Sequence, residues 1–178
     1  MESIYAPIGG EPQIFKKPFI LMPELWERFK YDDLPEVDFT NWGKVKMLDE
    51  DGNFSADLKN IPNEYGGIYI FCVVPNIIAE CGSYILYIGM ATKTDYENLR
   101  DRVKSYKTQM DEDYKRHRIH NMFSLWGDYM VVYYLPIDAS VEVIQTLEDR
   151  LIACFVPPCN SDIRDVEVKR KVKAFTNF

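Results

Sequence analysis

The order of apolar and polar residues after residue 65 predicts a short series of strands and helices. Three runs rich in β-branched and aromatic residues have the length of buried strands, and they cover 68–74, 84–90 and 129–135. Because a turn-rich connection joins the first two runs, we expect them to pair antiparallel. Apolar residues at helical spacing predict three helices, which cover 96–110, 112–126 and 141–155.

Each predicted helix has an apolar stripe or a stop signal. The stripe of the first helix consists of Tyr96, Leu99, Val103, Tyr106 and Met110. The stripe of the second consists of Ile119, Met122, Phe123 and Trp126, and Gly127 follows it. Ser140 can cap the third helix, and the pair Pro157-Pro158 ends it.

The first 64 residues follow no comparable pattern, because six of the ten prolines interrupt them. We expect one short helix at 23–31 and a hairpin of 44–48 and 54–58 with Gly52 in its turn. The sequence therefore predicts an α+β fold. It comprises a small three-stranded antiparallel sheet flanked by helices at 65–178, after an irregular, acidic N-terminal extension at 1–64.

Composition narrows the class of protein. The chain has 178 residues, of which 47% are hydrophobic, and this excludes a disordered or low-complexity protein. Four cysteines without a C-x-x-C pair argue for reduced, buried thiols rather than a disulfide framework. No apolar run approaches the roughly 18 residues that cross a bilayer, and the N-terminus lacks signal-peptide features. We expect a cytoplasmic protein with no membrane partner.

Charge is distributed unevenly along the chain. The net charge is −7, of which residues 1–64 carry −6 and residues 65–178 carry −1. Residues 93–118 nevertheless contain eight Lys or Arg, and residues 164–173 contain five. A nucleic acid can therefore bind only through local basic surfaces, and the acidic extension is expected to filter ligands or to dock a protein.

Glu148 is the most informative single position. It lies near the middle of the apolar stripe of the last helix, whereas Glu142, Asp149 and Arg150 point elsewhere. A carboxylate in such a place loses several kcal/mol of hydration unless it is paired or binds a metal ion. A buried ion pair with an arginine and a functional site are the two interpretations that the pattern leaves open.

Two tripeptides add a resemblance to a known family. Gly67-Ile68-Tyr69 opens the first strand, and Tyr87-Ile88-Gly89 lies in the second. The run 86–91 and the helix segment 99–106 continue the pattern. Residues 65 to about 162 thus resemble the GIY-YIG nuclease family, with a core similar to the nuclease half of the bacterial excision-repair incision protein.

The resemblance implies a set of catalytic residues: Tyr69, Tyr87, Arg102, Tyr106, Glu148 and Asn160. Glu148 would bind one Mg²⁺ or Mn²⁺ ion, and Arg102 would neutralise negative charge on the phosphoryl group. A tyrosine would orient or deprotonate the attacking water, and Asn160 would bridge strand and helix. Without the family spacings, the tyrosines would be read as packing residues and Asn160 as a turn residue.

The family implies a nucleic-acid partner, DNA in the first place and RNA as an alternative. Basic residues and histidines on the predicted helices are candidates for phosphate contacts, although a solvated basic face is an equal interpretation. These candidates are Arg100, Lys104, Lys107, Arg116, His117, Arg118, His120, Lys169, Arg170 and Lys171. The sequence does not determine the oligomeric state.

Two features depart from the family. Seventeen residues separate Tyr69 from Tyr87, which predicts an enlarged loop at 77–83, and Met90 stands where many members have lysine. We expect a divalent-metal-dependent endonuclease that acts on DNA. The alternative is a catalytically weak domain that serves as a binding module, which the acidic composition and Met90 favour.

Overall fold

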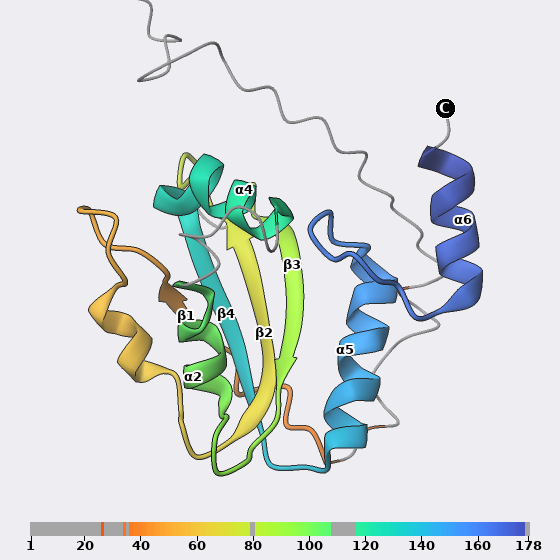
Figure 1. The fold of residues 1–178 in the computed structure, drawn as a ribbon, viewed down its shortest axis with the longest axis horizontal. Helices are drawn as coiled ribbons and strands as arrows, with labels where there is room; N and C mark the ends of the chain where they lie inside the picture. The colour runs from red at the N-terminus through yellow and green to blue at the C-terminus, as the bar shows by residue number, and fades with distance from the viewer. Residues whose placement is uncertain (1–25, 27–33, 35, 79–80, 108–116, 177–178) are drawn as a thin grey trace, which may run out of the picture.

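The structure, a computed structural model, describes residues 26, 34, 36–78, 81–107 and 117–176. Four strands form one sheet, and helices pack against it (Figure 1). The strands are β1 (Gly43–Lys46), β2 (Gly66–Val73), β3 (Tyr84–Ala91) and β4 (Met130–Ile137). The helices are α2 (Leu99–Lys104), α4 (His117–Trp126), α5 (Val141–Phe155) and α6 (Val166–Thr176), with short 3-10 helices η1 (Ala56–Asn60) and η2 (Gly127–Tyr129).

The α+β class is confirmed, but the sheet has four strands where the sequence predicted three. Its strands follow the order β1-β4-β2-β3, and each neighbouring pair is antiparallel. The additional strand, β1, comes from the segment that we assigned to the N-terminal extension, and it pairs with β4. Since β1 has only four residues and Val45 alone among them is buried, it lacks the alternation that marks a strand in a sequence.

The predicted hairpin of 44–48 and 54–58 is wrong in its second arm. Leu48 and Phe54 form an isolated bridge around a turn in which Gly52 has φ of 76°. Beyond this bridge the chain forms η1, at whose start the Ser55 hydroxyl accepts a hydrogen bond from the Asp57 N–H. The first arm pairs with β4 instead, where Gly43–Lys46 lie opposite residues 131–134.

Strand β2 lies between β3 and β4 and is buried along its whole length. Its side chains alternate between two core clusters on opposite faces of the sheet. Tyr69, Phe71 and Val73 belong to the first cluster, with residues of α2 and α4. Ile68, Ile70 and Cys72 belong to the second, with residues of α5. The continuous apolar run of β2 therefore reflects two covered faces.

Helix α5 covers the range that the sequence predicted. The Ser140 hydroxyl accepts a hydrogen bond from the Val143 N–H at the first turn, over 3.5 Å. Val156 ends the helix in a left-handed conformation, with φ of 45°, directly before the two prolines.

The first predicted helix is shorter than expected at its start. Helix α2 begins at Leu99, because the Asn98 side chain caps it by accepting a hydrogen bond from the Asp101 N–H. Tyr96 therefore precedes the helix, and its side chain is 96% exposed instead of buried. Met110 and residues 112–116 lie outside the described residues, and α4 matches the remainder of the second predicted helix.

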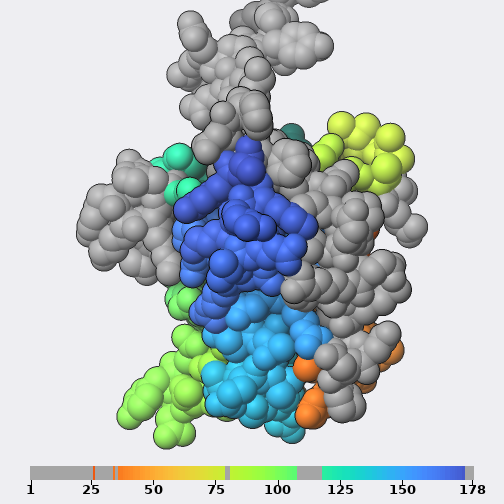
Figure 2. All heavy atoms as spheres, turned by 90° about the vertical axis from the view of Figure 1, so that its right-hand side faces the viewer, coloured from red at the N-terminus to blue at the C-terminus, as the bar shows by residue number. Residues whose placement is uncertain are grey.

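The basic tail contains a helix that we did not predict. Val168 of α6 is buried and packs against Ala153 of α5, and Figure 2 shows α6 lying above α5 on this face of the molecule. Of the helix predicted at 23–31, only Trp26 is among the described residues, and its indole N–H donates to the Cys154 carbonyl over 3.0 Å. The division of the chain at residue 64 stays a prediction.

Candidate functional site

A bulge in β3 sets the direction of Tyr87. Phe71 of β2 pairs with Tyr87, but the next residue, Cys72, pairs with Ile85, so that Leu86 is an extra residue. Leu86 and Tyr87 consequently both pack against the first core cluster, whereas regular alternation would send them to opposite faces. Bulges commonly redirect a side chain beside a functional site.

Three of the predicted catalytic residues, Tyr69, Tyr87 and Tyr106, form an aromatic cluster. The hydroxyl oxygens of Tyr69 and Tyr106 lie 2.8 Å apart, and neither side chain is exposed. The ring centroid of Tyr87 lies 6.3 Å from that of Tyr69 and 5.9 Å from that of Tyr106. Burial raises the pKa of both Tyr69 and Tyr106. Tyr87 raises the pKa of Tyr69 further, against the lowering effect of the hydrogen bond with Tyr106, and both Tyr69 and Tyr87 raise the pKa of Tyr106 further. The two buried phenols therefore hold their protons firmly.

The glycines of the two tripeptides lie where a side chain would collide with neighbouring atoms. Gly89 lies directly opposite Tyr69 in the sheet, and the ring occupies the space that a Cβ at position 89 would need. Gly67 has φ of 143°, and a Cβ there would meet the carbonyl oxygen of Leu135. Both positions accordingly require glycine for steric reasons.

Arg102 lies at the border of the aromatic cluster. Its guanidinium carbon is 6.0 Å from the Tyr106 ring centroid, and its Nη1 is 3.9 Å from Glu97 Oε2. Burial by itself would lower the pKa of Arg102, but Tyr69 and Tyr106 raise it, so the guanidinium stays charged. Its Nε is buried and has no hydrogen-bond partner among the described residues, which is an uncommon condition for a donor.

The segment after α5 covers the outer edge of β3. The Cys159 N–H donates to the Leu86 carbonyl over 2.9 Å. Asn160 then pairs twice with Ile88: its Oδ1 accepts from the Ile88 N–H over 2.9 Å, and its Nδ2 donates to the Ile88 carbonyl over 2.8 Å. The side-chain amide of Asn160 thus replaces a neighbouring strand and joins the segment after α5 to β3, where the resemblance implied a bridge between strand and helix.

Glu148 faces the same edge of β3 from α5. Its Oε2 accepts a hydrogen bond from Gln145 Nε2 over 2.7 Å, and the Met90 N–H of β3 stabilises the carboxylate. Burial is the main cause that raises the pKa of Glu148, and the bond from Gln145 opposes it. Arg164 also favours the charged form, but it pairs with Asp149, at 3.3 Å, rather than with Glu148.

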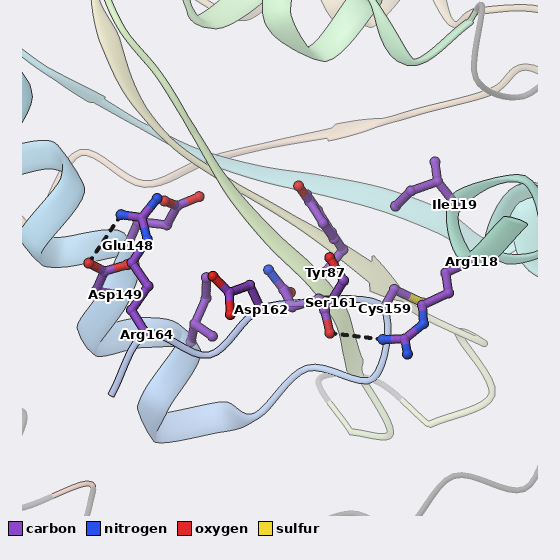
Figure 3. A pocket seen from close by; sticks show the side chains of 11 residues that line it. Tyr87, Arg118, Ile119, Glu148, Asp149, Cys159, Ser161, Asp162 and Arg164 are labelled. Atoms are coloured by element: carbon purple, nitrogen blue, oxygen red, sulfur yellow. Dashed lines mark hydrogen bonds and ion pairs between the residues drawn. The ribbon is translucent and has the colours of Figure 1, made fainter. Parts of the chain in front are cut away.

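A cavity of about 580 Å³ lies between α5, β3 and α4 (Figure 3). Tyr87 from β3, Glu148 from α5 and Asn160 from the following segment all line it. Arg118 of α4 lies at one end of the cavity in Figure 3, and the pair of Asp149 and Arg164 lies at the other. The remaining lining residues are Ile119, Ile152, Cys159, Ser161 and Asp162.

The predicted catalytic residues therefore fall into two groups. Those that line the cavity are Tyr87, Glu148 and Asn160. Those that do not are Tyr69, Arg102 and Tyr106. Tyr87 connects the groups, because its ring packs against the buried tyrosines while it also borders the cavity.

The candidates for phosphate contacts on α2 and α6 lie away from the centre of the cavity. Arg100 Nε donates to the carbonyl of Ile61, the residue that ends η1, over 2.6 Å. This bond holds the Arg100 side chain against that turn. Lys104 and Lys107 are exposed, and so is Arg170. Lys169 pairs with Asp162 at 2.9 Å, and Lys171 pairs with Glu167 at 3.2 Å. Figure 1 shows α2 and α6 on opposite sides of the molecule, so they do not form one continuous basic surface.

The candidates on α4 differ among themselves. Arg118 lines the cavity, and its Nη1 donates to the Asn160 carbonyl over 3.2 Å. His120 Nε2 lies 3.4 Å from the Ser124 hydroxyl on the next turn of the helix. Arg116 and the side chain of His117 lie outside the described residues.

Three charged residues of the cavity were missing from the predicted site: Asp149, Asp162 and Arg164. Asp149 follows Glu148 directly, and a step of about 100° around the helix made it point away from the apolar stripe. Asp162 and Arg164 belong to a segment without periodic pattern. Only the path of the chain after α5 places these residues beside Glu148.

The carboxylates of the cavity are not equally available to a metal ion. Asp149 pairs with Arg164, and Asp162 pairs with Lys169, which leaves Glu148 as the carboxylate without a cationic partner in the described part of the cavity. Residues 36–78, 81–107 and 117–176 contain no group of three or more His, Cys, Asp or Glu suited to a metal. Mg²⁺ commonly uses one or two carboxylates together with waters and phosphate oxygens, and a single Glu148 fits that type of site.

Comparison of the chain with protein-family models, with curated proteins and with solved structures finds no match. None of the helices in the described part of the chain is both long and apolar enough to cross a membrane.

Proposed function

We propose that this chain is a divalent-metal-dependent endonuclease of the GIY-YIG type that hydrolyses phosphodiester bonds in DNA. One observation carries the proposal. Tyr87 lies 61 residues before Glu148, and Asn160 lies twelve residues after it. All three come from the elements that the resemblance implies and line one open cavity. A phenol, a carboxylate and a bridging amide in one cavity are the groups that the proposed chemistry needs.

Hydrolysis requires an oriented water and stabilisation of the charge on phosphorus. The water oxygen forms a bond to phosphorus, the bond to the 3′ oxygen breaks, and the 3′ oxygen takes up the proton that the water releases. Mg²⁺ or Mn²⁺ bound to Glu148 would lower the pKa of a coordinated water and stabilise the leaving oxygen.

Tyr87 is the tyrosine that can touch the substrate, because Tyr69 and Tyr106 have no exposed surface. Its hydroxyl would orient the attacking water by accepting a hydrogen bond. Tyr69 and Tyr106 act as positioning residues, since their rings pack against Tyr87. Asn160 fixes the neighbouring residue of β3, Ile88, and thereby holds Tyr87 at the cavity wall.

The test is nicking of supercoiled plasmid by the full chain with Mg²⁺ or Mn²⁺, against a chelator control. Glu148→Gln should reduce nicking by several orders of magnitude and leave the melting temperature unchanged or higher, because the fold already disfavours the charged form of Glu148. Asp149→Asn is the matched control, since Asp149 lines the same cavity but pairs with Arg164. Equal nicking by wild type and Glu148→Gln would refute the metal role.

Arg102 has a separate test, because it does not line the cavity. The resemblance gives Arg102 the role of a charge partner in the transition state, and by that role Arg102→Ala should lower turnover by roughly a hundredfold. Arg100→Ala is the control, and its main expected effect is on stability, because Arg100 is bonded to the Ile61 carbonyl. Equal losses of turnover in both variants would contradict the role that the resemblance gives to Arg102.

A catalytically weak domain that only binds nucleic acid is the second candidate. Gln145 and the Met90 N–H already satisfy the Glu148 carboxylate, so this residue can serve to join α5 to the edge of β3. The absence of nicking with either ion, together with retained DNA binding, would favour this function over the first.

A further inference from the structure

Two arginines lie at opposite ends of the cavity that contains Glu148 and Tyr87. Arg118 comes from α4 and Arg164 comes from the segment between α5 and α6. Figure 3 shows the two guanidinium groups far apart, with Tyr87 between them. Each end of the cavity therefore carries one arginine, but the two arginines have different partners.

Arg164 is neutralised by a carboxylate. Its Nη1 lies 3.3 Å from Asp149 Oδ2, and this contact is drawn in Figure 3. The other carboxylate at the rim, Asp162, pairs with Lys169 at 2.9 Å. Two of the three carboxylates in the cavity lining thus already have cationic partners.

Arg118 has a neutral partner instead. Its Nη1 donates to the Asn160 carbonyl over 3.2 Å, and its side chain belongs to an exposed residue. A guanidinium has five N–H donors, and this bond uses one of them. The carbonyl also holds the side chain at the cavity, so that the remaining donors of the planar guanidinium are pre-organised to bind two oxygens of one acceptor, such as a phosphate.

We propose that Arg118 binds a backbone phosphate adjacent to the one that Glu148 and Tyr87 would serve. This inference rests on the proposed function, because it assigns a second phosphate of the same substrate. Since Arg118 and Glu148 lie at different ends of the cavity, the ligand is a polynucleotide with successive phosphates rather than a mononucleotide. Arg118 thus sets how the nucleic-acid backbone enters the site.

The experiment measures binding of the full chain to a short fluorescein-labelled DNA duplex in chelator, over a series of salt concentrations. Arg118→Gln should weaken binding about tenfold at low salt, the effect of losing one charged hydrogen bond. It should also reduce the slope of log K against log salt by about 0.9, the value for one phosphate contact. Arg118→Lys keeps the charge and should keep the slope.

Arg164→Gln is the matched control, because it removes the same charge from the other end of the cavity. It should leave the salt slope unchanged, since the partner of Arg164 is Asp149. Unchanged affinity and slope in Arg118→Gln would overturn the inference. Equal losses in Arg118→Gln and Arg118→Lys, with a lower melting temperature in both, would overturn it in favour of a structural bond to Asn160. No DNA binding by the wild type would overturn it as well.

The nicking assay separates this inference from the proposed function. If the wild type binds DNA through Arg118 but does not nick plasmid with either ion, the endonuclease fails and the phosphate contact stands. If the wild type nicks plasmid and Arg118→Gln keeps the full salt slope, the endonuclease stands and the phosphate contact fails.

Discussion

At the scale of single residues, the hydroxyl groups of Tyr69 and Tyr106 are fully buried polar groups beside the candidate site. The two hydroxyl groups form a hydrogen bond with each other over 2.8 Å, and neither ring is exposed to solvent. Such a pair is stable only while both phenols are neutral, because an ionised phenol there would lose its hydration. This condition links the stability of the fold to pH.

We expect the free energy of unfolding to fall as the pH rises above about 10. Burial raises the pKa of Tyr69 above its ordinary 10.0, so the unfolded chain releases this proton at a lower pH than the folded chain does. The contribution of the pair is therefore complete below pH 10 and is lost above it. Urea unfolding at several pH values would show the fall, and it should be smaller in the double variant Tyr69→Phe with Tyr106→Phe.

Tyr96→Phe is the control for this pH dependence. Its side chain is 96% exposed, so the substitution changes no buried hydroxyl. Tyr96→Phe should leave the pH dependence of the free energy of unfolding unchanged. If it alters that dependence as much as the double variant does, the buried pair is not the cause of the fall.

Gly89→Ala should destabilise the protein by about 1–3 kcal/mol, because the new methyl group and the Tyr69 ring need the same space. Chemical denaturation would measure the loss. The same substitution in a Tyr69→Ala background should cost less, since the competing ring is absent. An equal cost in both backgrounds would mean that the backbone of β3, rather than the ring, rejects a side chain at position 89.

At the scale of elements, β3 is an edge strand whose outer side is covered without another strand. Asn160 bonds twice to Ile88, the Cys159 N–H donates to the strand, and Glu148 meets the Met90 N–H. An uncovered strand edge is prone to pair with other chains. The segment after α5 therefore protects β3 and shapes the cavity with the same contacts.

Asn160→Ala should cost about 1–3 kcal/mol of stability, because it leaves the N–H and carbonyl of Ile88 without their partners. Amide hydrogen exchange at Ile88 should accelerate more than at Ile70, which lies in the central strand. Ser161→Ala is the control, since Ser161 also lines the cavity but is exposed. Equal stability of the two variants would contradict a structural role for the amide of Asn160.

At the scale of the whole molecule, the segment that we predicted as an extension contributes to the core. Several buried side chains before residue 61 belong to the cluster that surrounds Tyr69: Val45, Met47, Leu48 and Leu58. Strand β1 also covers one edge of β4. The part of the acidic segment that the structure describes therefore stabilises the sheet.

A chain of residues 61–178 should not unfold cooperatively. Burial of a large apolar side chain contributes about 1.5–3 kcal/mol, and the deletion removes six buried apolar side chains from a fold whose net stability is about 5–15 kcal/mol. A chain of residues 34–178 keeps all six and should unfold cooperatively. Circular dichroism during thermal unfolding would compare them. A sharp transition in the shorter chain, near that of the full chain, would contradict this role.

The sequence by itself determined the elements whose pattern is local. The apolar runs predicted β2, β3 and β4 to within a few residues, and the period of 3.6 with a serine cap predicted α5. The same stripe singled out Glu148 as a carboxylate on the apolar face, because side-chain direction on a helix follows from spacing alone, and the structure finds it half-buried.

Only the tertiary structure decided how the candidate site is divided. The bulge at Leu86 turns Tyr87 toward the aromatic cluster and the cavity. Tyr69 and Tyr106 instead form a hydrogen bond with each other and are buried. The pairing of β1 with β4, like the bonds from Asn160 to β3, joins residues that are about 70 or more positions apart. Local periodicity carries no information on such contacts, because they depend on how the packed elements compete for the edges of the sheet.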